Sequence, residues 1–198
     1  MKSLTTSEDL KELYEKDFYL WVYENLRLLR EGKYDQVDWE HLLEEIEDMG
    51  ISERKSLRSY IEVILEHIYK LDSLRRYSKY DTDIRQGGRG WEKSIINASR
   101  KVNVIVRDNP SLLQHLEDIT RDAWEIVRGE IMDFIKFLEM DGIIDSKTKR
   151  ELLRNIPEEL PYTMEEIADR ITELTEDDNN AFAQYIRKYK KGQKPGEP

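Results

Sequence analysis

Apolar residues recur at helical spacing along almost the whole chain, and this periodicity restricts the fold more than any other feature of the sequence. Each residue of an α-helix is rotated by about 100° from the one before it, so apolar positions three or four apart form one stripe. The segment closest to a strand, residues 102–106, continues a helical pattern on both sides. We therefore predict an all-α fold, a bundle of four principal helices with additional short C-terminal helices.

Capping residues and glycines set the limits of the first two predicted helices. The first is predicted over residues 7–31, with Gly32 as its stop. The second begins after the N-cap candidate Asp38 and runs to about residue 74. Its apolar stripe keeps the same phase on both sides of Gly50, which favours one long helix over two separate helices and leaves room for a kink at Gly50.

Two more long helices and three shorter ones complete the prediction. The third long helix begins at Trp91 and ends before Asn109, and Pro110 occupies the first turn of the fourth. The fourth helix ends at Asp141-Gly142. The shorter helices are predicted over residues 146–155, 163–174 and 177–191. Thr163 and Glu166 are expected to form a capping box at the start of the second of these.

The chain length of 198 residues favours a single hydrophobic core. We expect one helical domain over residues 1–174, an appended amphipathic helix over residues 175–191 and a disordered tail over residues 192–198. Residues 77–90 form a long irregular connection that contains several glycines.

The composition excludes several classes of chemistry. The chain has no cysteine, which rules out disulfides, thiol catalysis and thiolate metal sites. It has no run of about 18 apolar residues and no signal-peptide core, so we expect a cytoplasmic protein that does not contact the membrane. No cofactor-binding loop or complete metal-binding motif is present, and we predict neither a cofactor nor a metal site.

Positive charge is concentrated in one segment of an acidic chain. The formal net charge is -10, yet residues 70–101 carry a net charge of +5. Basic and aromatic residues alternate with glycines there, as in loops that contact phosphate or nucleic acid. The alternatives are that the basic residues neutralise the acidic helices of the same chain or meet an acidic protein partner. The candidate binding residues are Arg75, Arg76, Arg85, Arg89 and Trp91.

Five polar side chains fall on or beside apolar helical stripes. Glu53 and His67 lie on the second predicted helix, Asp17 and Asn25 on the first, and Glu130 on the fourth. A carboxylate buried without a partner costs several kcal/mol, so each should be paired, protonated or metal-bound.

Three interpretations of these polar residues stay open. They form a structural network, in which the carboxylates meet Arg or Lys and the neutral groups bind backbone carbonyls or water. They line a functional pocket, with Glu53, Glu130, His67 and Asp17 as the catalytic candidates. The third interpretation is that the helix breaks at Gly50 and the assumed phase does not hold.

The last predicted helix has a stripe of large apolar side chains with basic residues alongside. Packing on its own domain is the default expectation, and docking in the groove of another protein is the alternative. The residues that would form this partner helix are Phe182, Tyr185, Ile186 and Tyr189.

Several short segments share the spacing of a known family: Lys16–Trp21, Leu28–Gly32, Glu44–Arg54, Asn109–Leu112 and Pro161–Thr163. Over roughly residues 13–167 the chain resembles the bacterial and cyanobacterial family called domain of unknown function, number twenty-nine. The resemblance implies an α-helical cytosolic protein and no established activity.

The absence of a legible nucleophile–base, cofactor or metal motif favours a non-enzymatic bacterial protein-interaction module. An unidentified protein partner is therefore expected, and a homo-oligomer stays open. One alternative is a metal-assisted hydrolase or nuclease that uses the interior carboxylates and His67. The other is a nucleic-acid binder that uses the basic segment 75–101.

Overall fold

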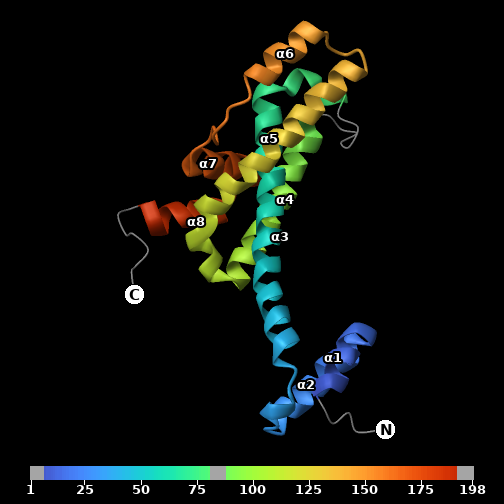
Figure 1. Cartoon of the computed structure of the whole chain (residues 1–198). Coiled ribbons are helices and arrows are strands. Elements are labelled where there is room, and N and C mark those ends of the chain that lie inside the picture. Colours follow the sequence, from blue (N-terminus) through green and yellow to red (C-terminus); the bar gives the residue numbers. More distant parts are fainter. Residues whose placement is uncertain (1–6, 81–87, 191–198) are drawn as a thin grey trace. The chain divides into compact units, whose positions relative to one another are not determined.

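The computed structural model describes residues 7–80 and 88–190, and every regular element in these ranges is a helix (Figure 1). The predicted all-α class is confirmed. The α-helices are α1 Ser7–Lys16, α2 Phe18–Arg30, α3 Trp39–Ser73, α4 Gly88–Asp108, α5 Leu116–Met140, α6 Ser146–Arg154, α7 Met164–Thr175 and α8 Ala181–Tyr185. Short 3-10 or π segments are η1 Tyr34–Gln36, η2 Arg75–Tyr80, η3 Pro110–His115 and η4 Ile186–Lys190.

The chain divides into two compact units, unit 1 over Met1–Ser52 and unit 2 over Glu53–Pro198. The division lies inside α3, where an unbroken helical pattern gives no change of composition to mark it. The predicted continuity of this helix through Gly50 is confirmed. The expected division at residue 174 has no counterpart in this partition, because α8 belongs to unit 2. The tail predicted over residues 192–198 lies outside the described residues.

Unit 1 has a small core of its own, made by Leu10, Trp21, Leu28 and Val37. The single helix predicted over residues 7–31 is wrong, since α1 ends at Lys16 and α2 begins at Phe18. The Asp17 carboxylate accepts a hydrogen bond from the backbone N–H of Leu20 at 3.0 Å. This is an N-cap, so Asp17 starts a new helix where the apolar pattern alone suggested a continuous one.

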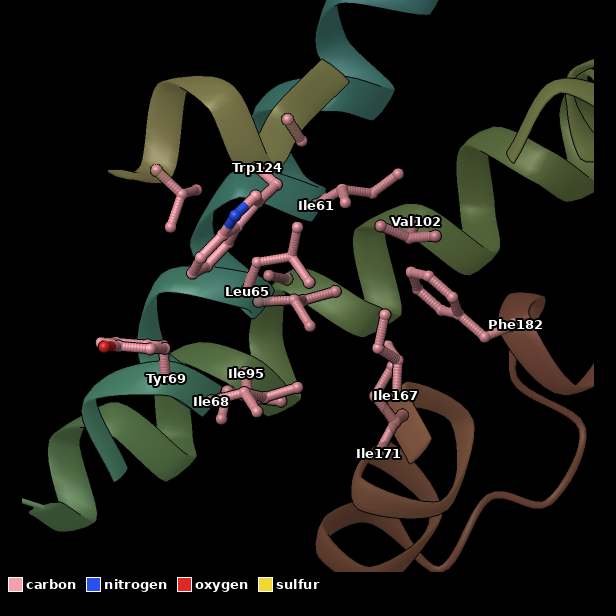
Figure 2. Packing of buried hydrophobic residues seen from close by; sticks show 14 of the residues in the cluster. Ile61, Leu65, Ile68, Tyr69, Ile95, Val102, Trp124, Ile167, Ile171 and Phe182 are labelled. Atoms are coloured by element: carbon pink, nitrogen blue, oxygen red, sulfur yellow. The ribbon is translucent and has the colours of Figure 1, made fainter. Parts of the chain in front are cut away.

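The larger core belongs to unit 2. The inner face of α3 contributes Ile61, Leu65, Ile68 and Tyr69, and Figure 2 shows these side chains meeting residues from the other helices of the unit. Those residues include Ile95 and Val102 of α4, Trp124 of α5, Ile167 and Ile171 of α7 and Phe182 of α8.

Several predicted helix ends are confirmed by their caps. Thr163 and Glu166 form the predicted capping box at the start of α7. Gly142 has a φ of 68°, a conformation that glycine adopts easily, and follows the end of α5. The fourth long helix begins differently from the prediction, because the turn at Pro110 is a 3-10 segment and α5 starts at Leu116.

Candidate functional site

The four catalytic candidates occupy different surroundings. Asp17 is exposed and serves as the cap of α2. Glu53 is exposed as well, and its carboxylate accepts a hydrogen bond from Asn109 at 3.4 Å. The helical phase places Glu53 in the apolar stripe, but the core of unit 2 begins one turn later, at Leu57. Within unit 2, Glu53 is therefore a surface residue whose carboxylate binds the Asn109 side chain.

Asn25 and His67, the two members of the polar set that are not carboxyls, are buried, and each contacts a carbonyl of its own helix. The Asn25 amide donates to the Trp21 carbonyl at 3.0 Å, and His67 Nδ1 lies 2.8 Å from the Val63 carbonyl. Both acceptors are one turn earlier in the helix. This is the arrangement that the structural-network interpretation predicts for these two residues.

A buried ammonium group lies between α3 and α5. Lys70 Nζ is 2.7 Å from a Glu66 carboxylate oxygen and 4.4 Å from the centre of the Phe134 ring. Partial burial raises the pKa of the Glu130 carboxyl, and the nearby Glu66 and Glu62 raise it further, while Lys70 lowers it. Glu130 is nevertheless an exposed residue, so this group of charges sits at the edge of the core.

The basic segment is partly used within the protein. Arg75 forms an ion pair with Glu92 at 3.0 Å, and the Arg76 guanidinium lies 4.8 Å from the centre of the Tyr77 ring. Arg89 is exposed in the first turn of α4. Trp91 is fully buried, so its ring has no free face for stacking on a base.

Arg85, the remaining candidate of the basic segment, lies outside the described residues. The ion pair between Arg75 and Glu92 is of the kind expected if the basic residues neutralise acidic helices of the same chain.

The C-terminal stripe faces its own unit. Phe182 and Tyr185 are buried, and Ile186 and Tyr189 pack against the same core. The Tyr185 hydroxyl donates to Glu117 at 2.5 Å, and burial together with this bond raises the pKa of Tyr185. These contacts agree with the default expectation for this helix, and in this structure they occupy the side chains that the partner-helix alternative would need.

Exposed apolar side chains gather in unit 1, a feature that helical periodicity in the sequence does not predict. Ten of the thirteen large hydrophobic residues that are exposed among the described residues lie between positions 18 and 51. They are Phe18, Tyr19, Val22 and Tyr23 on α2, Tyr34 on η1, and Trp39, Leu43, Ile46, Met49 and Ile51 on α3. Single exposed hydrophobic residues are ordinary, but a group of this size on one small unit is unusual and makes unit 1 the candidate location of a functional surface.

The first turns of α3 carry a continuous part of this surface, which we call the seam. It consists of Trp39, Leu43 and Ile46, which are 45%, 56% and 56% exposed. Their spacing of four and three residues places them on one line along the helix. Gly50 continues the line one turn later, with open space beside its Cα.

Other side chains of the same turns pack inside unit 1. Leu42 contacts the small core, and the His41 ring stacks on Tyr14 with 4.1 Å between ring centres. The Tyr14 hydroxyl donates to Glu45 at 2.6 Å. This bond is the main reason that the pKa of Tyr14 is raised to about 12. These contacts fix the rotation of the helix and thereby direct the seam away from the core of unit 1.

A buried carboxyl group anchors the start of α3. Asp38 is only 1% exposed, and its Oδ2 lies 3.1 Å from the Trp21 indole nitrogen and 2.7 Å from His41 Nδ1. Its backbone N–H donates to the Asn25 side chain at 2.9 Å. The Asp38 side chain thus links α2 to α3. The predicted N-cap position is correct, but the hydrogen bonds of this carboxyl go to other side chains.

The surface beside the seam is acidic. Residues 39–52 contain five Asp or Glu side chains and no Lys or Arg. Glu40, Glu44 and Glu47 follow one another at helical spacing and form an acidic row on one side of the seam. Glu40 pairs with Lys11 at 2.5 Å, and this bond lowers the pKa of the Glu40 carboxyl. Glu44 and Glu47 are exposed and have no ion pair among the described residues.

Over 7–80 and 88–190, no group of three His, Asp or Glu side chains is placed to hold a metal ion. No helix in these ranges is long and apolar enough to span a bilayer. Two clefts of about 470 and 520 Å³ lie in unit 2, one beside Trp124 and the other beside Tyr69.

Comparison with known proteins identifies the family of the chain. A family model described as "Domain of unknown function DUF29" matches residues 13–171, and the chain belongs to this family. No curated protein and no solved structure matches the chain.

Proposed function

We propose that this member of the DUF29 family is a cytosolic protein-interaction module and that the seam of unit 1 is its docking surface. The observation that carries the proposal is the line of exposed side chains formed by Trp39, Leu43 and Ile46. The proposal keeps the class of function that the sequence predicts. It moves the contact surface from the basic segment and the C-terminal helix to the start of α3.

The energy available at the seam suits a binding surface. Fully burying one large apolar side chain is worth about 1.5–3 kcal/mol relative to leaving it exposed. The seam residues are about half exposed, so covering all three would yield about 2–4 kcal/mol. The neighbouring tyrosines of α2 would add to this area, and tyrosine is common in binding interfaces.

The rigid support of the seam is a second argument. The Asp38 hydrogen bonds and the Tyr14–His41 stack hold the first turns of α3 in one orientation before any partner binds. The Trp39 indole N–H also donates to the Tyr34 carbonyl at 2.8 Å, which restrains the ring. A preformed surface loses less conformational entropy on binding than a flexible one.

Site-specific photo-crosslinking in the native cells tests the proposal. A photoreactive phenylalanine derivative would replace Ile46, and in a matched control it would replace Ile126, an exposed apolar residue of α5. We expect a discrete crosslinked protein from position 46 and none from position 126. The same adducts from both positions, or none from position 46, would overturn the proposal.

The other two functional alternatives stay predictions. A hydrolase would use Asp17 and Glu53 as catalytic groups. In the structure Asp17 caps α2, and Glu53 accepts a hydrogen bond from Asn109 at the surface. For a nucleic-acid binder, the aromatic residue expected to stack on bases, Trp91, is buried. No geometry in the described residues favours either function over protein binding.

A further inference from the structure

The seam also indicates the chemistry of its partner. Resting on the proposed function, we infer that the seam binds an amphipathic helix of another protein that carries Lys or Arg beside its apolar stripe. The inference uses the shape of the seam and the charge of the acidic row.

The shape of the seam fits a helix. Trp39, Leu43 and Ile46 form a single ridge, and Gly50 leaves a gap at the end of that ridge. From Trp39 to Gly50 the ridge is about 16 Å long at about 1.5 Å per residue. Ridges of this kind pack into the grooves of a second helix, and residues without a large side chain allow the backbones to approach. The matching partner is therefore a helix of about three turns.

The acidic row beside the seam determines which sign of charge the partner helix should carry. The acidic row of Glu40, Glu44 and Glu47 runs along the ridge, and no Lys or Arg occurs in residues 39–52. Glu40 is already paired with Lys11, so Glu44 and Glu47 supply the charge that a partner meets. A partner helix that covers the ridge brings its own flanking residues next to these carboxylates. Basic flanks gain attraction there, while acidic flanks meet like charges in a surface that is being desolvated.

The same reasoning disfavours other occupants. A second copy of this chain docked ridge to ridge would place two acidic rows side by side. A nucleic acid or an anionic membrane surface would be repelled by the same carboxylates. A basic helix is the occupant for which apolar burial and electrostatics act in the same direction.

The seam contains its own spectroscopic reporter. The chain has four tryptophans, and Trp21, Trp91 and Trp124 are buried while Trp39 is exposed. Quenching of tryptophan fluorescence by acrylamide therefore reports mainly on Trp39 in the folded full-length protein. Covering the seam should protect Trp39 and shift its emission to shorter wavelength.

The test titrates the full-length protein with two synthetic helical peptides of about 15 residues. Both carry leucines spaced to match the seam, and one has Lys where the other has Glu beside the leucines. We expect the Lys peptide to protect Trp39 in a saturable way that weakens as salt is raised. The Glu peptide should not protect it. A Trp39→Phe variant should lose the signal, which assigns the signal to the seam.

Matched variants separate the apolar and the charge contributions. Ile46→Ser should weaken binding of the Lys peptide by about fivefold, because Ile46 supplies about one third of the apolar contribution of the seam. The double variant Glu44→Gln and Glu47→Gln should weaken binding of the Lys peptide by about fivefold and make that binding less dependent on salt concentration. The same double charge change at Glu158 and Glu159, exposed residues of unit 2, should leave binding unchanged.

Each other outcome overturns the inference. Equal binding of the two peptides would show that charge does not select the partner. Protection of Trp39 that grows with protein concentration alone would identify a second copy as the occupant. A crosslinked partner captured at position 46 through an acidic or uncharged segment would overturn the basic-helix inference and leave the proposed interaction function standing. Absence of any adduct at position 46 would instead overturn the proposed function itself.

Discussion

Removing the Asp38 carboxyl should lower the stability of unit 1 and leave the stability of unit 2 unchanged. The Asp38→Ala substitution removes the acceptor for Trp21 and His41 and leaves the buried Trp21 N–H without its partner. Each lost hydrogen bond costs about 1.5 kcal/mol, or about 3 kcal/mol for the two. The substitution also removes Oδ1, a buried oxygen with no hydrogen bond. Removing this unsatisfied group stabilises the folded state by about 1 kcal/mol. The net loss is about 2 kcal/mol.

The absence of cysteine makes this loss measurable in each unit separately. A Val37→Cys background places one buried thiol in unit 1, and an Ala123→Cys background places one in unit 2. Under conditions where closing is faster than labelling, the rate of thiol labelling follows the free energy of opening. A loss of about 2 kcal/mol should therefore speed labelling at position 37 by about 30-fold, with little change at position 123.

The controls define what would refute the reasoning. Asp35→Ala, an exposed position in the same connection, should change neither rate by more than about twofold. An Asp38→Ala effect below about fivefold at position 37 would show that the hydrogen bonds do not hold unit 1 together. An equal acceleration at position 123 would show that the two units open as one.

Three further predictions concern titration and capping. In an ultraviolet titration of tyrosine ionisation, Glu45→Gln should return the pKa of Tyr14 from about 12 toward 10, and no change would show that the Glu45 bond is not its cause. Because the folded state raises the pKa of Glu130, this carboxyl disfavours folding increasingly as pH rises from about 4.3 through its folded-state pKa. Glu130→Gln should therefore raise the thermal midpoint at pH 7, by the equivalent of less than about 0.5 kcal/mol because the residue is exposed and screened, and the gain should vanish at pH 4. Thr163→Ala should destabilise unit 2 by about 1 kcal/mol in urea unfolding and Thr163→Ser should not, while equal effects would contradict a capping role.

Local signals in the sequence predicted the local features of the fold. The helical class, the continuity of α3, the capping box of α7 and the glycine that follows α5 depend on residues within a few positions of one another. The break at Asp17 was missed because a capping aspartate and an exposed helical aspartate look alike when the apolar stripe continues past them.

The candidate site was harder to predict because burial depends on distant neighbours. The buried polar pair Asn25 and His67 was identified from helical phase, and its backbone partners were anticipated. Trp91 was assigned to a binding surface from the basic residues around it, but α4 turns it into the core of unit 2. The acidic residues near the seam have the sequence pattern of an ordinary solvated helix surface, and nothing in the sequence shows that the apolar side chains beside them stay uncovered.

The helix α3 separates what the sequence determined from what the tertiary structure decided. The spacing of its apolar residues was enough to place Trp39, Leu43 and Ile46 in the same stripe as Leu57 and Ile61, because backbone geometry alone sets which side chains share a face. Only the tertiary structure decided that the last two are fully buried and the first three about half exposed. Burial requires other helices to lie over the stripe, and their positions depend on packing between residues far apart in the chain.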